Sequence, residues 1–246
     1  MSISAYLATV VTRAQELLGD RLVGVYPSGS VAFDAYRPGR SDVDLIAVAD
    51  RPSPAEVATI AGALSHDALP CPAAGLELVL YDRTTLAALT TEAGFALNLN
   101  TGRELPPKAE TDPGDGLTFW YPIDRDIVCQ QRRVLIGPPF TELSPRQPYD
   151  VLLPVVAESV AAQLDEIIAH GDNAVLNGCR ALRYHAERTW SAKPVAAAWA
   201  LDHAPGFERV ITAGLDSHAR DRAAGGTVDV ELARAFLTFV LARCRS

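Results

Sequence analysis

Two aspartates at the start of an apolar segment constrain this chain more than any other feature of its sequence. Asp42 and Asp44 lead into residues 45–49, a run rich enough in branched apolar side chains to predict a buried strand. Residues i and i+2 of a strand point to the same face, so both carboxylates should lie side by side where the strand begins. Like charges this close repel each other, and a divalent cation that prefers oxygen ligands, such as Mg²⁺, would remove the conflict.

A Gly-Ser turn precedes the aspartates. Ser28, Gly29 and Ser30 follow residues 22–26, another short apolar run that predicts a strand. Glycine permits close approach of the backbone to a ligand, and backbone N–H groups at such a turn can hold phosphate oxygens. Aspartate is common at turns, so the aspartates alone would indicate only a polar turn before a strand. The turn and the aspartates together favour a magnesium-dependent site for a nucleoside triphosphate.

Glu77 is a third acidic residue, and it lies inside the apolar run 76–81. Strand alternation puts it on one face with Val79 and Tyr81. An ionised carboxylate in so apolar a strand is costly unless it is paired or coordinates a cation, and the alternative is an edge-strand glutamate that faces water. Beside the aspartate pair, Glu77 could bind metal or take the proton from an attacking hydroxyl group. Two metal ions can stabilise both the attacking and the leaving oxygen in phosphoryl chemistry.

These motifs resemble the signature of the nucleotidyltransferase superfamily, which is carried here by Gly29-Ser30, residues 40–45 and Glu77. Later segments are similar, in the same order, to those of the aminoglycoside (3'')(9) adenylyltransferase family: residues 98–102, 135–139, 175–180 and 191–199. The resemblance spans nearly the whole chain. It implies an α/β (α+β) nucleotidyltransferase domain with a mixed sheet over residues 1–143. It also implies an all-α helical bundle domain over residues 144–246, with ATP and the acceptor between the two.

The resemblance further implies an activity and the residues that carry it. AMP would pass from ATP to a hydroxyl group of an aminoglycoside or aminocyclitol antibiotic such as streptomycin or spectinomycin. Glu77 would be the catalytic base and an acceptor-binding residue, and it would share two Mg²⁺ ions with Asp42 and Asp44. The residues implied to bind ATP are Ser28, Gly29, Ser30, Ser41, Asp124, Arg180 and Lys193.

One departure from the family pattern bears on the acceptor. The streptomycin-modifying members carry a tryptophan and an aspartate just before the second helix of the C-terminal domain. Residues 165–173 contain no tryptophan here, and only Asp172 matches a substrate-binding acid. We therefore expect spectinomycin to be a better acceptor than streptomycin. Two alternative functions stay open. The chain could be a nucleotidyltransferase that modifies a hydroxyl group on a protein, an RNA or another small molecule, or it could be a non-catalytic nucleotide-binding module.

Composition and charge limit the kinds of binding partner and the cellular compartment that we expect for this chain. A length of 246 residues suits two domains, and a net charge of -8 argues against a broad nucleic-acid surface while allowing an acidic pocket for a cationic ligand. No apolar run approaches the roughly 20 residues of a membrane span. The first residues show helical apolar spacing that ends at Gly19, which predicts a helix and not a signal peptide. Four widely spaced cysteines suit a reducing compartment. We expect a cytoplasmic monomer with no nucleic-acid or membrane partner.

Apolar periodicity also predicts the helices of the second half. A first helix begins near residue 150 and is closed by Gly171, and Asp172 or Asn173 caps a second that runs to about residue 189. Residues 193–203 and 228–243 predict two more helices, and together the four form an antiparallel bundle. Residues 102–117 predict a long loop, because glycine, proline and charged side chains dominate them.

Overall fold

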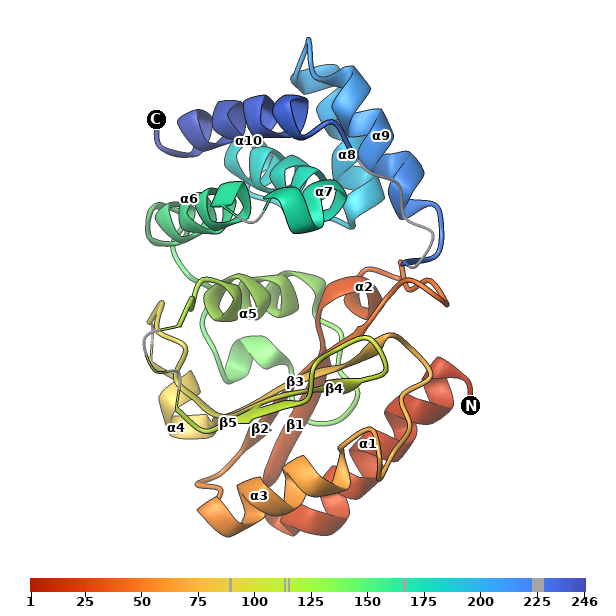
Figure 1. Ribbon diagram of the computed structural model, residues 1–246. Helices are drawn as coiled ribbons and strands as arrows, with labels where there is room; N and C mark the ends of the chain where they lie inside the picture. The colour runs from red at the N-terminus through yellow and green to blue at the C-terminus, as the bar shows by residue number, and fades with distance from the viewer. Residues whose placement is uncertain (89, 113, 115, 166, 223–227) are drawn as a thin grey trace. The chain divides into compact units, whose positions relative to one another are not determined.

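The computed structural model describes residues 1–88, 90–112, 114, 116–165, 167–222 and 228–246. The chain divides into two compact units, Met1–Gln147 and Pro148–Ser246. The first unit combines a five-stranded sheet with helices, and the second is helical (Figure 1). The mixed sheet followed by a helical region confirms the predicted fold class. Among the helices of the described ranges, none is both long enough and apolar enough to cross a membrane.

The sheet of the first unit has the strand order β1-β2-β3-β4-β5. Its strands are β1 (Leu22–Pro27), β2 (Val43–Ala49), β3 (Gly75–Asp82), β4 (Phe95–Gly102) and β5 (Lys108–Glu110). Strands β2 and β3 pair in parallel, and every other neighbouring pair is antiparallel. Because β2 and β3 run in the same direction, both begin at the same edge of the sheet. The first residues of β2 and β3, which are far apart in the sequence, therefore lie side by side at this edge.

The prediction of one long loop over residues 102–117 is wrong in part, because strand β5 lies within this segment. Its sequence, Lys108-Ala-Glu110, has too few apolar side chains to show strand alternation. The strand exists because Ala109 pairs with Leu99 of β4, whose own sequence carries the strand signal. A short polar edge strand of this kind is formed by its neighbour and cannot be detected from its own residues.

The two faces of the sheet are covered by different helices (Figure 1). The helices of this unit are α1 (Ile3–Leu18), α2 (Gly29–Ala32), α3 (Pro54–Ala63), α4 (Arg83–Leu86) and α5 (Trp120–Gln131), with 3-10 turns η1 (Gly19–Arg21) and η2 (Phe140–Glu142). Helices α1 and α3 pack on the face that buries Leu45 and Leu78. Helix α5 covers the opposite face, where Ile46 and Tyr81 are buried with Val128. Since side chains alternate along a strand, Asp44 and Glu77 also point to the α5 face.

The N-terminal helix agrees with the sequence prediction. Helix α1 begins after Ser2, whose side chain accepts a hydrogen bond from the Ala5 backbone N–H. It ends at Leu18, and Gly19 follows with φ of 53°, a value that glycine adopts without strain.

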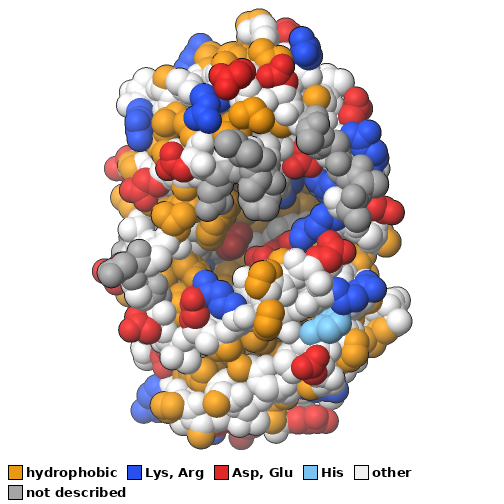
Figure 2. Space-filling view, viewed as in Figure 1, with side chains coloured by type: hydrophobic (Ala, Val, Ile, Leu, Met, Phe, Trp, Pro, Cys, Tyr) orange, Lys and Arg blue, Asp and Glu red, His pale blue; other side chains and the backbone are white. Residues whose placement is uncertain are grey.

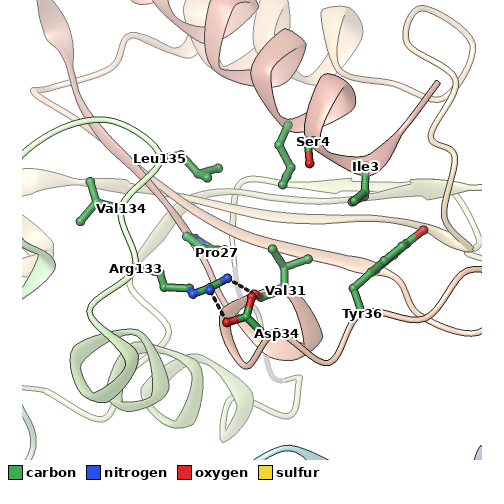
Figure 3. A pocket seen from close by; sticks show the side chains of 10 residues that line it. Ile3, Ser4, Pro27, Val31, Asp34, Tyr36, Arg133, Val134 and Leu135 are labelled. Carbon is green, nitrogen blue, oxygen red and sulfur yellow. Dashed lines mark hydrogen bonds and ion pairs between the residues drawn. The ribbon is translucent and has the colours of Figure 1, made fainter.

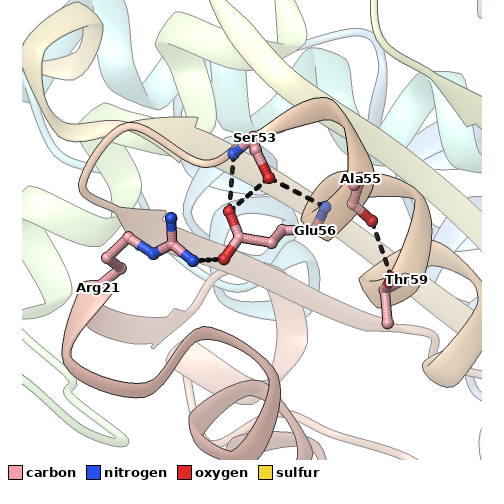
Figure 4. A network of polar contacts seen from close by, with 5 residues as sticks. All are labelled: Arg21, Ser53, Ala55, Glu56 and Thr59. Atoms are coloured by element: carbon pink, nitrogen blue, oxygen red, sulfur yellow. Dashed lines mark hydrogen bonds and ion pairs between the residues drawn. The ribbon is translucent and has the colours of Figure 1, made fainter.

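Helix α3 begins with a capping box that also engages an arginine from another segment (Figure 4). The Ser53 hydroxyl accepts from the Glu56 N–H at 3.3 Å, and the Glu56 carboxylate accepts from the Ser53 N–H at 2.8 Å. Arg21 forms an ion pair with the same carboxylate. Glu56 therefore holds the start of α3 to the turn that precedes β1.

Glu56→Ala should lower the free energy of unfolding by about 1–2 kcal/mol, because it removes the cap and the ion pair together. Urea denaturation followed by circular dichroism measures the change. Thr59→Ala is the matched control, since the Thr59 hydroxyl donates only to the Ala55 carbonyl within the same helix (Figure 4). Its effect should stay within about 0.5 kcal/mol. Equal losses in both variants would contradict a special role for the capping box.

The second unit is built around one long helix. Its helices are α6 (Tyr149–Asp165), α7 (Ile167–Glu187), α8 (Lys193–His203), α9 (Glu208–His218) and α10 (Val230–Cys244). Helix α7 packs against each of the other four. The helix predicted for residues 193–203 is confirmed with the same limits. Helix α9 was not predicted.

The predicted boundary at Gly171 is wrong. Helix α7 already begins at Ile167, so Gly171, Asp172 and Asn173 lie inside it and cap nothing. A Cβ at Gly171 would collide with the side chain of Val228. The glycine therefore serves close packing against the segment before α10, and this requirement is not visible in the local sequence.

Charged side chains of both signs are interspersed over the face of the molecule drawn in Figure 2, among scattered apolar ones. This distribution fits a chain with 22 basic and 30 acidic residues.

Candidate active site

Strand register brings the predicted carboxylates together. Asp44 of β2 is the direct partner of Glu77 of β3 in the parallel pair. Neighbouring strands lie about 4.8 Å apart, and paired residues point to the same face. Asp42 lies two residues before Asp44, immediately outside β2. The sheet thus places carboxylates from two chain segments at one edge of the α5 face.

The Gly-Ser turn lies directly against Asp44. The Ser28 backbone N–H donates to the Asp44 carbonyl at 2.9 Å. Gly29 adopts φ of 48°, and a Cβ at this position would overlap the Asp44 carboxylate. Only glycine combines this backbone conformation with so close an approach. The turn and the aspartate therefore form one structural unit.

The two other serines of the motif contact the backbone of the segment between the turn and the aspartates. The Ser30 hydroxyl lies 3.5 Å from the Asp42 carbonyl, the long limit of a hydrogen bond. The Ser41 hydroxyl accepts from the Arg37 N–H at 3.1 Å, which closes the turn that leads into Asp42. An accepting hydroxyl still carries its own proton, which can be donated to a phosphate oxygen.

Asp124 reaches the same turn from helix α5. The Ser28 hydroxyl donates to the Asp124 carboxylate at 3.2 Å, although the two residues are 96 positions apart in the sequence. The structure therefore groups Asp124 with Ser28, Gly29 and Asp44. Because the single proton of the Ser28 hydroxyl is donated to Asp124, the pair offers a ligand acceptor oxygens at the end of β1.

A row of polar residues crosses the sheet at this edge. Ser28 lies beside Asp44, Asp44 pairs with Glu77, Glu77 pairs with Asn100 of β4, and Asn100 pairs with Lys108 of β5. Sequence reasoning assigned no role to Asn100 or Lys108. The period of two in Asn98-Leu99-Asn100 was a usable signal, because Leu97 and Leu99 are buried on the opposite face.

A second polar cluster lies next to this row. Asn98 donates to the Glu110 carboxylate at 3.4 Å, and Lys108 pairs with Glu110 at 2.8 Å. Burial raises the pKa of Tyr121 to about 12, and the charges of Glu110, Asp124 and Glu77 add to the rise. The phenol of Tyr121, on α5, therefore stays protonated near these carboxylates. The clustered negative charge suits a cationic ligand.

The residues of the row fit a magnesium ion that is shared with a triphosphate. In the part of the chain that the structure describes, no group of three or more His, Cys, Asp or Glu side chains could by itself hold a metal ion. Mg²⁺ rarely needs such a cage, since one or two carboxylates usually bind it together with substrate phosphates and water. Oxygen donors at Asp42 and Asp44, beside a glycine turn that packs directly against the Asp44 carboxylate, meet this requirement.

The predicted residues of the second unit take part in contacts of α7 with the segment where α8 starts and with α9. The Arg180 guanidinium donates from Nε to the Ser191 carbonyl at 3.1 Å and lies 5.5 Å from the centre of the Trp190 ring. Lys193 donates to the Asn173 side chain at 2.7 Å. Asp172 accepts from the buried Ser217 hydroxyl at 2.6 Å, so α7 and α9 hold its carboxylate in place.

A cavity of about 380 Å³ lies elsewhere in the first unit (Figure 3). Its lining residues are Ile3, Ser4, Leu7, Pro27, Val31, Asp34, Tyr36, Arg133, Val134 and Leu135. Arg133 pairs with Asp34 across it and donates to the Val31 carbonyl at 2.9 Å. The predicted carboxylates are not among these lining residues. The polar row, and not this cavity, is therefore the candidate active site.

Comparisons with known proteins give one family match and one similar solved structure. Residues 143–243 match the family model described as the aminoglycoside adenylyltransferase C-terminal domain. The whole fold is similar to the spectinomycin adenyltransferase AAD(9) from Enterococcus faecialis, a structure solved with ATP and spectinomycin. The TM-score is 0.71 at 15% sequence identity, with 98% of this chain and 99% of that chain covered. A search of curated protein sequences finds no match.

Proposed function

We propose that this chain, whose residues 143–243 match the family model of the aminoglycoside adenylyltransferase C-terminal domain, transfers AMP from ATP to a hydroxyl group of an aminocyclitol antibiotic. One observation carries the proposal: Asp44 and Glu77 are register partners at the edge of the sheet where Gly29 packs against Asp44. An acid pair beside a glycine turn suits a triphosphate and its metal ion better than it suits sheet packing.

The proposed mechanism is an in-line displacement at the α-phosphorus. Glu77 takes the proton of the acceptor hydroxyl, whose oxygen attacks the α-phosphorus as the bond to the bridging oxygen breaks and pyrophosphate leaves. Asp42, Asp44 and Glu77 would hold the Mg²⁺ that accompanies the triphosphate. When bound, this ion neutralises developing negative charge. Positioning and charge neutralisation supply most of the rate.

The ATP contacts are proposed residue by residue. Ser30 and Ser41 donate to phosphate oxygens, and the backbone of Gly29 lets the triphosphate approach. The Ser28 hydroxyl accepts from the nucleotide while it donates to Asp124. Asp124 accepts from the nucleotide. The cations Arg180 and Lys193 pair with the phosphates.

We propose spectinomycin as the preferred acceptor. The structural relative was solved with spectinomycin, and residues 165–173 of this chain lack the tryptophan expected of a streptomycin-modifying enzyme. Asp172 is the proposed acid that binds the acceptor from the second unit. A cytoplasmic location and a monomeric state complete the proposal.

Pyrophosphate release from ATP and Mg²⁺ tests the function directly. The protein is incubated with spectinomycin, with streptomycin or without an acceptor, and the product is identified by mass spectrometry. We expect release and an AMP adduct with spectinomycin only. ATP binding without release in any of the three reactions would contradict an aminocyclitol acceptor and direct the search to other hydroxyl groups.

A further inference from the structure

We propose that Asn100 is an acceptor-positioning residue, which holds a second polar substituent of the acceptor while Glu77 engages the reacting hydroxyl group. The inference rests on the proposed function, because it concerns the acceptor of the same site. It starts from the place of Asn100 in the polar row.

Register places Asn100 beside Glu77. The two residues are direct partners in the antiparallel pair of β3 and β4, away from the irregularity between Leu80 and Tyr81. Directly opposed residues have Cβ atoms between about 4.5 and 5.5 Å apart and point to the same face. Leu99 is buried on the opposite face, so Asn100 faces the α5 side with Glu77 and Asp44.

Sheet packing does not account for an asparagine at this position. Asparagine is depleted in strands, and β4 is an interior strand of the sheet. Asn98, on the same face, is buried and donates to Glu110. Asn100 is only half-buried, and its side-chain amide makes no hydrogen bond to another residue within the described ranges. Its donor and acceptor groups are therefore available to a ligand beside the proposed base.

The chemistry of the amide defines what it can hold. Its NH₂ group donates and its oxygen accepts, so it can bind a hydroxyl group or an amine. A polycyclic acceptor that carries such a substituent near its reacting hydroxyl would contact Asn100 and Glu77 at the same time. Two-point attachment fixes the direction of attack, and small losses of alignment are costly in rate. Asn100 would thus select which hydroxyl group is modified.

The test compares Asn100→Ala with Asn98→Ala, a matched change on the same strand and face. Steady-state rates are measured with spectinomycin and with analogues that each lack one hydroxyl or amine group. We expect Asn100→Ala to lower kcat/KM for spectinomycin by about 10- to 100-fold, the effect of leaving one polar contact unmade. KM for ATP and the thermal midpoint should stay close to the wild-type values. Asn98→Ala should change kcat/KM for spectinomycin by less than about threefold.

The analogues separate positioning from a merely structural role. For one analogue, kcat/KM of the wild-type protein should be about 10- to 100-fold lower than for spectinomycin. The Asn100→Ala variant should show no further loss of kcat/KM with this analogue, since both changes remove the same contact. Losses that multiply for every analogue, or an Asn100→Ala variant as active as wild type, would overturn the role of Asn100 alone. A wild-type protein that transfers AMP to no aminocyclitol would contradict the proposed function, and the inference with it.

Discussion

Glu77→Gln should lower kcat by at least about 100-fold and leave the affinity for ATP within a few-fold of wild type. The amide keeps the shape of the carboxylate but cannot take a proton, and a general base contributes about two to four decades in rate. The loss corresponds to about 3 kcal/mol or more of transition-state stabilisation. Pyrophosphate release measures kcat, and isothermal titration calorimetry measures ATP binding.

Glu110→Gln is the matched control for charge. Glu110 lies on the same face of the sheet but is paired with Lys108 and hydrogen-bonded by Asn98. Its replacement removes one negative charge near the site without removing the proposed base, so kcat should fall by less than about threefold. Near-normal activity of Glu77→Gln would refute the assignment of Glu77 as the base.

Gly29→Ala should abolish most of the activity, with a loss of about 100-fold or more, while costing about 1–3 kcal/mol in the free energy of unfolding. The added Cβ would overlap the Asp44 carboxylate, and φ of 48° is unfavourable for alanine by about 1–2 kcal/mol. Either the turn or the carboxylate must move, and both are proposed to hold the triphosphate and its metal ion. Steady-state kinetics and chemical denaturation measure the two effects.

Gly62→Ala provides the control for the same chemical change. Gly62 lies within α3, where an added Cβ meets open space. Alanine in a helix interior should raise the free energy of unfolding by up to about 1 kcal/mol and leave kcat unchanged. A Gly29→Ala variant with wild-type activity would show that catalysis does not need the close approach of the turn to Asp44.

Features that depend on neighbouring residues could be predicted from the sequence. The i and i+2 spacing of Asp42 and Asp44, the glutamate in an apolar strand and the helix over Lys193–His203 are local patterns, and the period of the backbone makes them readable. The same holds for Gly19 at the end of α1, because a helix stop needs only the conformation of one residue.

Features that depend on pairing between distant segments required the tertiary structure. Asp124 contacts Ser28, which lies 96 positions away in the sequence. A glycine is needed at position 171 because the side chain of Val228 packs against it. Strand β5 forms by pairing with β4. The alternation around Asn100 indicates which face of the strand it occupies, but only the register of β3 and β4 puts it next to Glu77. The sequence by itself therefore predicted the acidic residues of the site, the glycine turn and the two-part architecture. Only the tertiary structure decided which residues surround the carboxylates, because strand register and helix packing come from contacts that no local pattern records.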